Sequence, residues 1–221
     1  MIPNHLLPQK FYFLRHGQST ANQQKIMAGG KFDSPLSDLG RQQAEKAAEV
    51  AAHLFADQPV TVFHSHLQRA SHTALLASRY LQAGLVCCPE LREQEIGTWE
   101  AQPWDMVLPL MHQGIDPPQG ENSQQFRQRA AVGFRAAFQG RSMPLIVAHG
   151  GVFHGFCGMM GYRLRDFIVP NALWCRFTRV DESPDENRFP YRIEKLSLNE
   201  NSQLQAEELQ LNLVPLEEYK L

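Results

Sequence analysis

Two histidines of this chain stand at the ends of short apolar runs, and each is followed by glycine. His16 comes after Arg15 and the apolar run 11–14, and His149 comes after the apolar run 145–148. The planar donor fork of arginine matches the oxygens of a phosphate group. A neutral imidazole can attack phosphorus, and a second imidazole can donate a hydrogen bond to the phosphoryl oxygens. These residue types therefore suit phosphoryl transfer through a covalent intermediate.

The apolar runs predict buried strands, and a third such run ends shortly before Arg69. In doubly wound α/β sheets, the loops at the carboxyl ends of the strands line the ligand crevice. We therefore expect Arg15, His16, Arg69 and His149 to meet at one edge of the sheet, with Arg69 one turn into a helix. Burying unpaired charges costs several kcal/mol, so we expect an anion such as phosphate between them.

The rest of the chain alternates between strand and helix patterns. Apolar spacing predicts helices at 37–55, 67–81 and 126–138, and one that begins at 150. Strands are predicted at 11–14, 60–63, 85–88, 145–148, 173–180 and 191–198, with a polar turn at 183–187 before the last of them. We expect an irregular stretch at 93–120, which holds four prolines, and we assign no element to the polar C-terminal tail.

This alternation predicts an α/β fold. We expect a single three-layer domain over residues 1–221, with a mostly parallel central sheet flanked by helices. The formal net charge of −2 gives no reason to expect nucleic acid or an anionic membrane as a partner. We find no evident signal peptide, no run long enough to span a membrane and no Cys-x-x-Cys pair. We therefore expect a soluble cytoplasmic protein with free, mostly buried thiols. A homodimer is compatible with the sequence, which does not define the oligomeric state.

Six pieces of the sequence, in order and at matching spacing, resemble branch 1 of the histidine phosphatase superfamily, which includes the phosphoglycerate mutases. The pieces are 14–19 with Asn22, 35–37 with Gly40 and Ala44, 65–70 with Thr73 and Ala74, 91–93 with Gly97, Trp99 and Glu100, 120–123 with Phe126 and Arg129, and 147–151. Any one of them is weak evidence, but together they cover nearly the whole chain. The resemblance implies a phosphoglycerate mutase-like fold.

The resemblance also implies the roles of individual residues. His16 would be the nucleophile that is transiently phosphorylated, and Glu93 would be the general acid for the leaving alcohol, although Glu95 lies two residues on and could compete for that role. The phosphoryl oxygens would be held by Arg15, Arg69 and His149. The same pocket would be lined by Gln18, Ser19, Asn22 and the backbone N–H of Gly150.

No cofactor or metal is implied by the resemblance, and the sequence holds no evident grouping of Asp, Glu and His at metal-ligand spacing. Two departures from the family pattern stand out. Ala101 follows Glu100 where the family often has glycine, and Gln18 replaces the commoner glutamate.

The segment 94–126 contains no lysine or arginine, and in the family this region forms part of the pocket rim. A rim without cations disfavours a second phosphate or carboxylate on the substrate, and Lys25 and Lys31 are the nearest alternatives. We therefore expect a phosphatase that hydrolyses a small phosphomonoester. A phosphoglycerate mutase activity is the runner-up. A non-catalytic relative that binds a phosphorylated ligand is disfavoured, because the five expected catalytic residues are all present. A serine hydrolase is also disfavoured, because no Gly-x-Ser-x-Gly elbow occurs.

Overall fold

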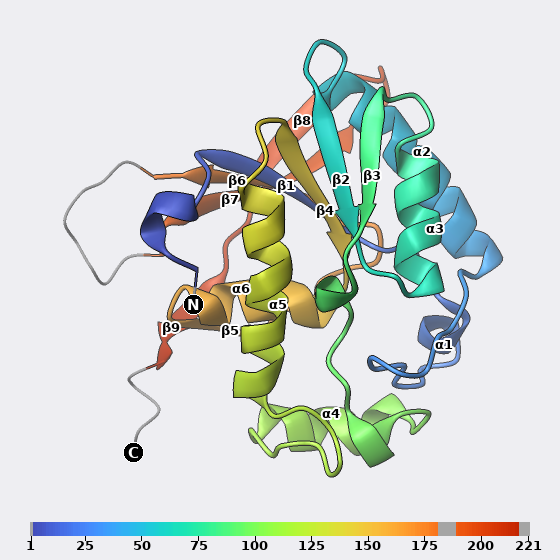
Figure 1. Ribbon diagram of the computed structural model, residues 1–221. Helices are drawn as coiled ribbons and strands as arrows, with labels where there is room; N and C mark the ends of the chain where they lie inside the picture. The colour runs from blue at the N-terminus through green and yellow to red at the C-terminus, as the bar shows by residue number, and fades with distance from the viewer. Residues whose placement is uncertain (1, 181–188, 217–221) are drawn as a thin grey trace.

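A computed structural model describes residues 2–180 and 189–216 of the chain; the turn expected at 183–187 lies outside the described residues. Seven strands form the central sheet in the order β3-β2-β4-β1-β6-β7-β8 (Figure 1). In chain order these are β1 (Lys10–Arg15), β2 (Val60–His64), β3 (Ala83–Cys87), β4 (Met143–Ala148), β6 (Trp174–Arg179), β7 (Tyr191–Leu198) and β8 (Leu204–Glu208). A second sheet pairs β5 (Tyr162–Arg165) with β9 (Asn212–Pro215).

Strands β3, β2, β4 and β1 are mutually parallel. Strand β6 runs antiparallel to β1, β7 antiparallel to β6, and β8 antiparallel to β7, so β7 points the same way as the four parallel strands. The predicted α/β class with a mostly parallel central sheet is therefore confirmed. The antiparallel strands β6, β7 and β8 extend the sheet beyond β1.

Helices cover both faces of the sheet, so that the parallel strands lie in the middle of three layers (Figure 1). The α-helices are α1 (Thr20–Gln23), α2 (Asp38–Leu54), α3 (Gln68–Ala77), α4 (Trp104–His112), α5 (Ser123–Phe138) and α6 (Gly150–Met159). Short 3-10 helices are η1 (Asn4–Leu6), η2 (Pro89–Leu91) and η3 (Gly97–Trp99).

Strand β1 shows why the chain folds into these layers. Successive side chains of a strand point to opposite faces, and in β1 both sets are apolar. Phe11 and Phe13 pack in the core that α5 and α6 cover, whereas Tyr12 and Leu14 pack in the core that α2 and α3 cover. A continuous apolar run is what a parallel strand needs when it is buried on both faces.

Three predictions about local structure were wrong or incomplete. The stretch 93–120, expected to be irregular, contains α4, whose Val107 packs with Ile96 and Trp99 in a small apolar cluster. Helix α3 ends at Ala77 and not at 81, and Ser78 donates its hydroxyl hydrogen to the carbonyl of Ala74 at 2.8 Å. The C-terminal tail, to which no element was assigned, forms β8 and β9.

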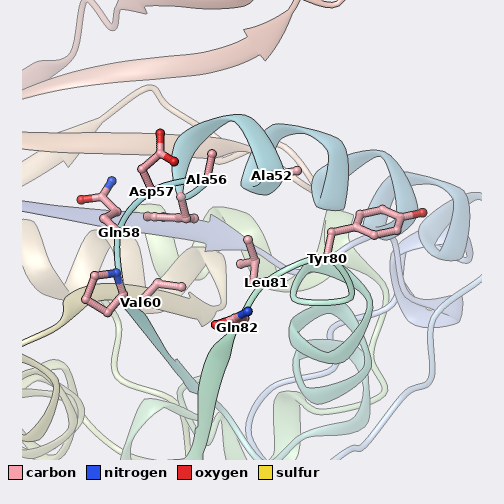
Figure 2. A pocket seen from close by; sticks show the side chains of 10 residues that line it. Ala52, Ala56, Asp57, Gln58, Val60, Tyr80, Leu81 and Gln82 are labelled. Atoms are coloured by element: carbon pink, nitrogen blue, oxygen red, sulfur yellow. The ribbon is translucent and has the colours of Figure 1, made fainter.

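A cavity of about 610 Å³ opens at the amino end of β2, between the end of α2 and the loop after α3 (Figure 2). Its polar lining includes Asp57, Gln58, Tyr80 and Gln82. The histidines stand at the carboxyl ends of β1 and β4, so this cavity lies at the other end of the sheet. Within the described ranges, no helix is long and apolar enough to cross a membrane.

Candidate active site

The two histidines lie side by side because β1 and β4 are parallel neighbours. Arg15 is in register with Ala148, so the next residue of each strand is a histidine at the same sheet edge. The N–H of His16 donates to the carbonyl of Ala148 at 3.0 Å. The imidazole rings are 5.1 Å apart between centroids, and the residues are only 3% and 0% exposed, respectively.

A backbone contact defines the proton position on His16. Its Nδ1 lies 2.7 Å from the carbonyl oxygen of Gly17. A carbonyl only accepts, so Nδ1 carries the hydrogen, and the lone pair of the neutral ring is on Nε2. Burial, followed by the charges of Arg15 and Arg69, holds the pKa of His16 well below its ordinary range. The ring is therefore a neutral base at pH 7.

His149 is buried without hydrogen bonds to its ring. Neither Nδ1 nor Nε2 has a partner among the described residues. Burial and then the nearby charge of Arg69 hold the pKa of His149 well below its ordinary value. A buried polar group left unpaired costs about 1–3 kcal/mol, and an oxyanion that accepts from the ring would recover that cost.

Arg15 is a second residue with hydrogen-bond donors that are only partly used. Its Nη1 donates to the carbonyl of Val169, whereas its Nε is buried and has no partner within the described part of the chain. The pKa of Arg15 is lowered to about 10, mainly by burial. The negative charge of Glu93 raises this pKa, and the positive charge of Arg69 lowers it. The guanidinium is still fully charged at neutral pH.

Arg69 is the second residue of α3, in its first turn, and not one turn into the helix as expected. It is only 2% exposed. Its Nη2 donates to the carbonyl of Gly29 at 2.8 Å and its Nη1 to that of Phe32 at 3.4 Å, and Asp33 lies at 4.0 Å. Burial lowers the pKa of Arg69, while the charge of Glu93 acts in the opposite direction. The loop 29–32 therefore fixes the orientation of this guanidinium.

Glu93 lies on the segment before η3, and its carboxylate is directed toward the group of residues around His16. Its Oε2 accepts from the N–H of Gly151 at 2.9 Å and its Oε1 from the N–H of Gln94 at 2.9 Å. Gly151 is the second residue of α6, and His149 is the N-cap of that helix. The carboxylate is thus attached to the helix end that carries His149, where the helix dipole favours negative charge.

Glu95, the competing candidate for the acid, is occupied elsewhere. Its carboxylate accepts from Arg92 at 2.8 Å and lies 3.2 Å from the ammonium of Lys31. Partial burial raises the pKa of Glu95, but the hydrogen bonds and charges of Arg92 and Lys31 outweigh it, so the pKa lies below its ordinary value. The ion pairs with Arg92 and Lys31 therefore occupy this carboxylate.

The other pocket residues expected from the sequence take part in local hydrogen bonds. Gln18 accepts at its side chain from the hydroxyl of Ser37 at 2.8 Å. Ser19 caps α1: its side chain accepts from the N–H of Asn22, and the Asn22 side chain accepts from the N–H of Ser19. Gly150 is the first residue of α6, so its N–H has no acceptor within the helix.

Two supporting residues were not identified from the sequence as parts of the site. Asn171 donates its side-chain amide to the carbonyl of His16 at 3.3 Å and to the side chain of Asn22 at 3.0 Å. Thr73 accepts from the N–H of Gly17 and donates to the carbonyl of Arg69. Thr73 was one of the matched family positions, whereas the loop that carries Asn171 has no motif that could have revealed it.

The segment without lysine or arginine lies at the same end of the sheet as the two histidines. Helix α4 lies beyond the carboxyl ends of the parallel strands (Figure 1). Trp99 and Val107 are buried in its small core, while Met106 is exposed. Lys31 approaches this segment but is paired with Glu95. Within residues 2–180 and 189–216, no group of three or more His, Cys, Asp and Glu residues could hold a metal ion.

The sequence of this chain is similar to those of known proteins. Fructose-2,6-bisphosphatase TIGAR B of Danio rerio is 31% identical over 136 residues, which is 57% of this chain and only 52% of that relative. The probable phosphoglycerate mutase GpmB of Yersinia pestis is 29% identical over 192 residues, covering 78% of this chain and 86% of its own length.

Among solved structures, a mycobacterial glucosyl-3-phosphoglycerate phosphatase in complex with VO3 superposes with a TM-score of 0.65 at 23% identity, over 84% of this chain and 97% of its own. At that identity the likeness shows the fold. The family model described as histidine phosphatase superfamily (branch 1) matches residues 11–191, which is most of the chain. The chain therefore belongs to branch 1 of the histidine phosphatase superfamily.

Proposed function

We propose that the protein is a phosphatase that hydrolyses a small phosphomonoester through a phosphohistidine on His16. The observation that carries this proposal is the tautomer of His16. Its Nδ1–H is bound to the carbonyl of Gly17, and the ring is neutral and buried beside two arginines. The Nε2 lone pair is thereby available as a nucleophile within an anion-binding site.

In the first step, Nε2 of His16 attacks phosphorus and the bond from phosphorus to the alcohol oxygen breaks. Glu93 donates a proton to that oxygen, so the alcohol leaves neutral. Arg15, Arg69 and His149 meet the charge on the three equatorial phosphoryl oxygens. In the second step, water attacks phosphorus, Glu93 accepts a proton from the water, and the phosphorus–nitrogen bond breaks to release inorganic phosphate.

The choice of hydrolysis over mutase chemistry is supported by the rim. A mutase must bind a bisphosphorylated intermediate, and the segment 94–126 offers no lysine or arginine for a second phosphate. Lys31 of the first loop lies 3.2 Å from Glu95, which compensates its charge. Two of the similar proteins carry phosphatase names, while the relative aligned over 86% of its own length carries a mutase name, so mutase activity is the second candidate.

The decisive experiment is rapid quench with a ³²P-labelled alkyl phosphate. We expect a labelled protein adduct that is stable in base and labile in acid, as a phosphoramidate is, and that is absent from His16→Ala. Release of inorganic phosphate should exceed interconversion of 2- and 3-phosphoglycerate. The reverse ratio would make the protein a mutase. Tight phosphate-ester binding without any adduct or turnover would make it a binding protein.

A further inference from the structure

Glu100 is a carboxylate outside the group of residues around His16, and it accepts backbone hydrogen bonds from the distant first loop and from Ile96, four residues before it. Its oxygens accept from the N–H of Lys31 at 3.1 Å, from that of Phe32 at 2.6 Å and from that of Ile96 at 3.3 Å. Lys31 and Phe32 are 69 and 68 residues away in sequence. The side chain therefore fastens the first loop to the segment that precedes α4.

Backbone pairing beside Glu100 holds the same two segments together. Met27 donates its N–H to the carbonyl of Gln102 at 2.8 Å, and Ala101 donates its N–H to the carbonyl of Met27 at 2.8 Å. Ala101 has φ of 62°, a left-handed conformation that glycine adopts far more readily than alanine, and it is the position where the family often has glycine. This backbone pairing does not include residues 31 and 32, whose N–H groups bind the Glu100 carboxylate instead.

The same loop also binds Arg69. The carbonyls of Gly29 and Phe32 accept from the two terminal nitrogens of its guanidinium. Gly29 has φ of 61°, and a Cβ there would lie 2.7 Å from Oε1 of Glu100, so the loop approaches the carboxylate as closely as glycine allows. The backbone of the loop thus binds both the carboxylate of Glu100 and the guanidinium of Arg69.

We propose that Glu100 is a positioning residue for Arg69, acting through the backbone of residues 29–32. This inference rests on the proposed function, in which Arg69 binds the phosphoryl oxygens. A displacement of about 1 Å in such a group can cost roughly 10²-fold in rate. Replacing Glu100 by glutamine removes one acceptor and turns an NH₂ group toward backbone N–H donors. The loop, and the guanidinium with it, should then move.

The test measures direct binding of orthovanadate, by calorimetry, to the wild type, Glu100→Gln, Arg69→Gln and the double variant. We expect Glu100→Gln to weaken binding roughly tenfold, as loss of an outer-shell partner does at metal sites. In the Arg69→Gln background the same change should have almost no further effect, because Glu100 acts through Arg69. Additive losses would overturn the inference, because a general effect on the fold does not depend on Arg69.

Glu194→Gln is the matched control. Glu194 is a half-buried carboxylate that accepts two hydrogen bonds from Arg176 on the antiparallel side of the sheet. We expect this variant to change the melting temperature while leaving vanadate affinity within twofold of the wild type. A tenfold loss of affinity in Glu194→Gln as well would show that the assay reports stability, and it would overturn the inference.

A second measurement needs no variant. If the Glu100 contacts support vanadate binding, then bound vanadate must stabilise those contacts by the same free energy. Amide hydrogen exchange at Lys31 and Phe32 should therefore slow at least threefold when vanadate is added to the wild type. Unchanged exchange would contradict the inference alone. A wild-type protein that does not bind vanadate at all would instead contradict the proposed function.

Discussion

The N–H of Gly151 donates to Oε2 of Glu93 at 2.9 Å, across a sequence separation of 58 residues. This bond attaches the segment that carries the proposed acid to the first turn of α6. His149 is the N-cap of the same helix. The proposed acid and one of the imidazoles proposed to bind the phosphoryl group are therefore linked through the first turn of one helix, which limits how far they can separate.

The first prediction follows from the role of that carboxyl group. An alkoxide leaving phosphorus is strongly basic and needs a proton as the bond breaks, whereas nitrophenolate is already a stable anion. Glu93→Gln should slow phosphorylation by an alkyl phosphate by roughly 10²–10⁴-fold and by p-nitrophenyl phosphate far less. Single-turnover rates with both substrates measure this. Equal losses for the two leaving groups would remove Glu93 from the acid role.

The second prediction concerns Gly151 itself. A Cβ at this position would overlap Oε1 of Glu93, so alanine must displace the carboxylate from the end of α6. Gly151→Ala should reproduce the leaving-group pattern of Glu93→Gln in the same single-turnover assay. Gly140→Ala is the control, because Gly140 lies outside the site and a Cβ there meets nothing closer than 3.9 Å. If both alanine variants slow phosphorylation by the alkyl phosphate and by p-nitrophenyl phosphate to the same extent, the assignment of Glu93 as the acid is wrong.

The arrangement of His16 and His149 could be predicted from the sequence because it depends on strands. Each histidine ends an apolar run, and parallel strands bring their carboxyl ends to one edge of the sheet. The anchoring of Arg69 could not be predicted in this way. Its partners are the carbonyls of Gly29 and Phe32, and backbone acceptors leave no trace in the residue types around them.

The missed elements have physical explanations of the same kind. Helix α4 contains Pro109, and proline is normally read as ending a helix, so the four prolines of 93–120 concealed its apolar spacing. Every residue of β8 is exposed, so it lacks the alternation that marks a half-buried strand. Strand β9 is defined by its pairing with β5, a long-range contact that a local pattern does not contain.

The third prediction is tight binding of a transition-state mimic together with metal independence. Vanadate can adopt five-coordinate geometry, and Arg15, Arg69 and His149 are arranged to meet the charge of a transferring phosphoryl group. Vanadate should therefore inhibit with a constant at least about 10²-fold below the KM of a phosphomonoester. Activity should survive EDTA, measured separately because EDTA chelates vanadate. Loss of activity in EDTA that magnesium restores would contradict the proposed electrostatics.

The last prediction concerns stability as a function of pH. Burial, with the charges of nearby arginines, holds the pKa values of His16 and His149 well below 6.5 in the folded protein, and burial also lowers the pKa of His154. In the unfolded chain each imidazole titrates near its ordinary value of about 6.5. Below that pH the unfolded chain binds protons that the folded chain does not, so acid favours unfolding.

Stability should accordingly fall as the pH drops from about 7.5 toward 5.5, by up to about 1.4 kcal/mol per pH unit for each such histidine. Denaturant titrations at several pH values measure this slope. His149→Gln should reduce it by about one proton, because glutamine does not titrate. Trp174→Phe is the control: it removes a buried indole N–H that has no partner among the described residues, so it should shift stability equally at every pH. If the curves of stability against pH are parallel for wild type and His149→Gln, His149 accepts a proton in the folded protein as readily as in the unfolded chain. The ring would then not be the neutral hydrogen-bonding group that the mechanism requires.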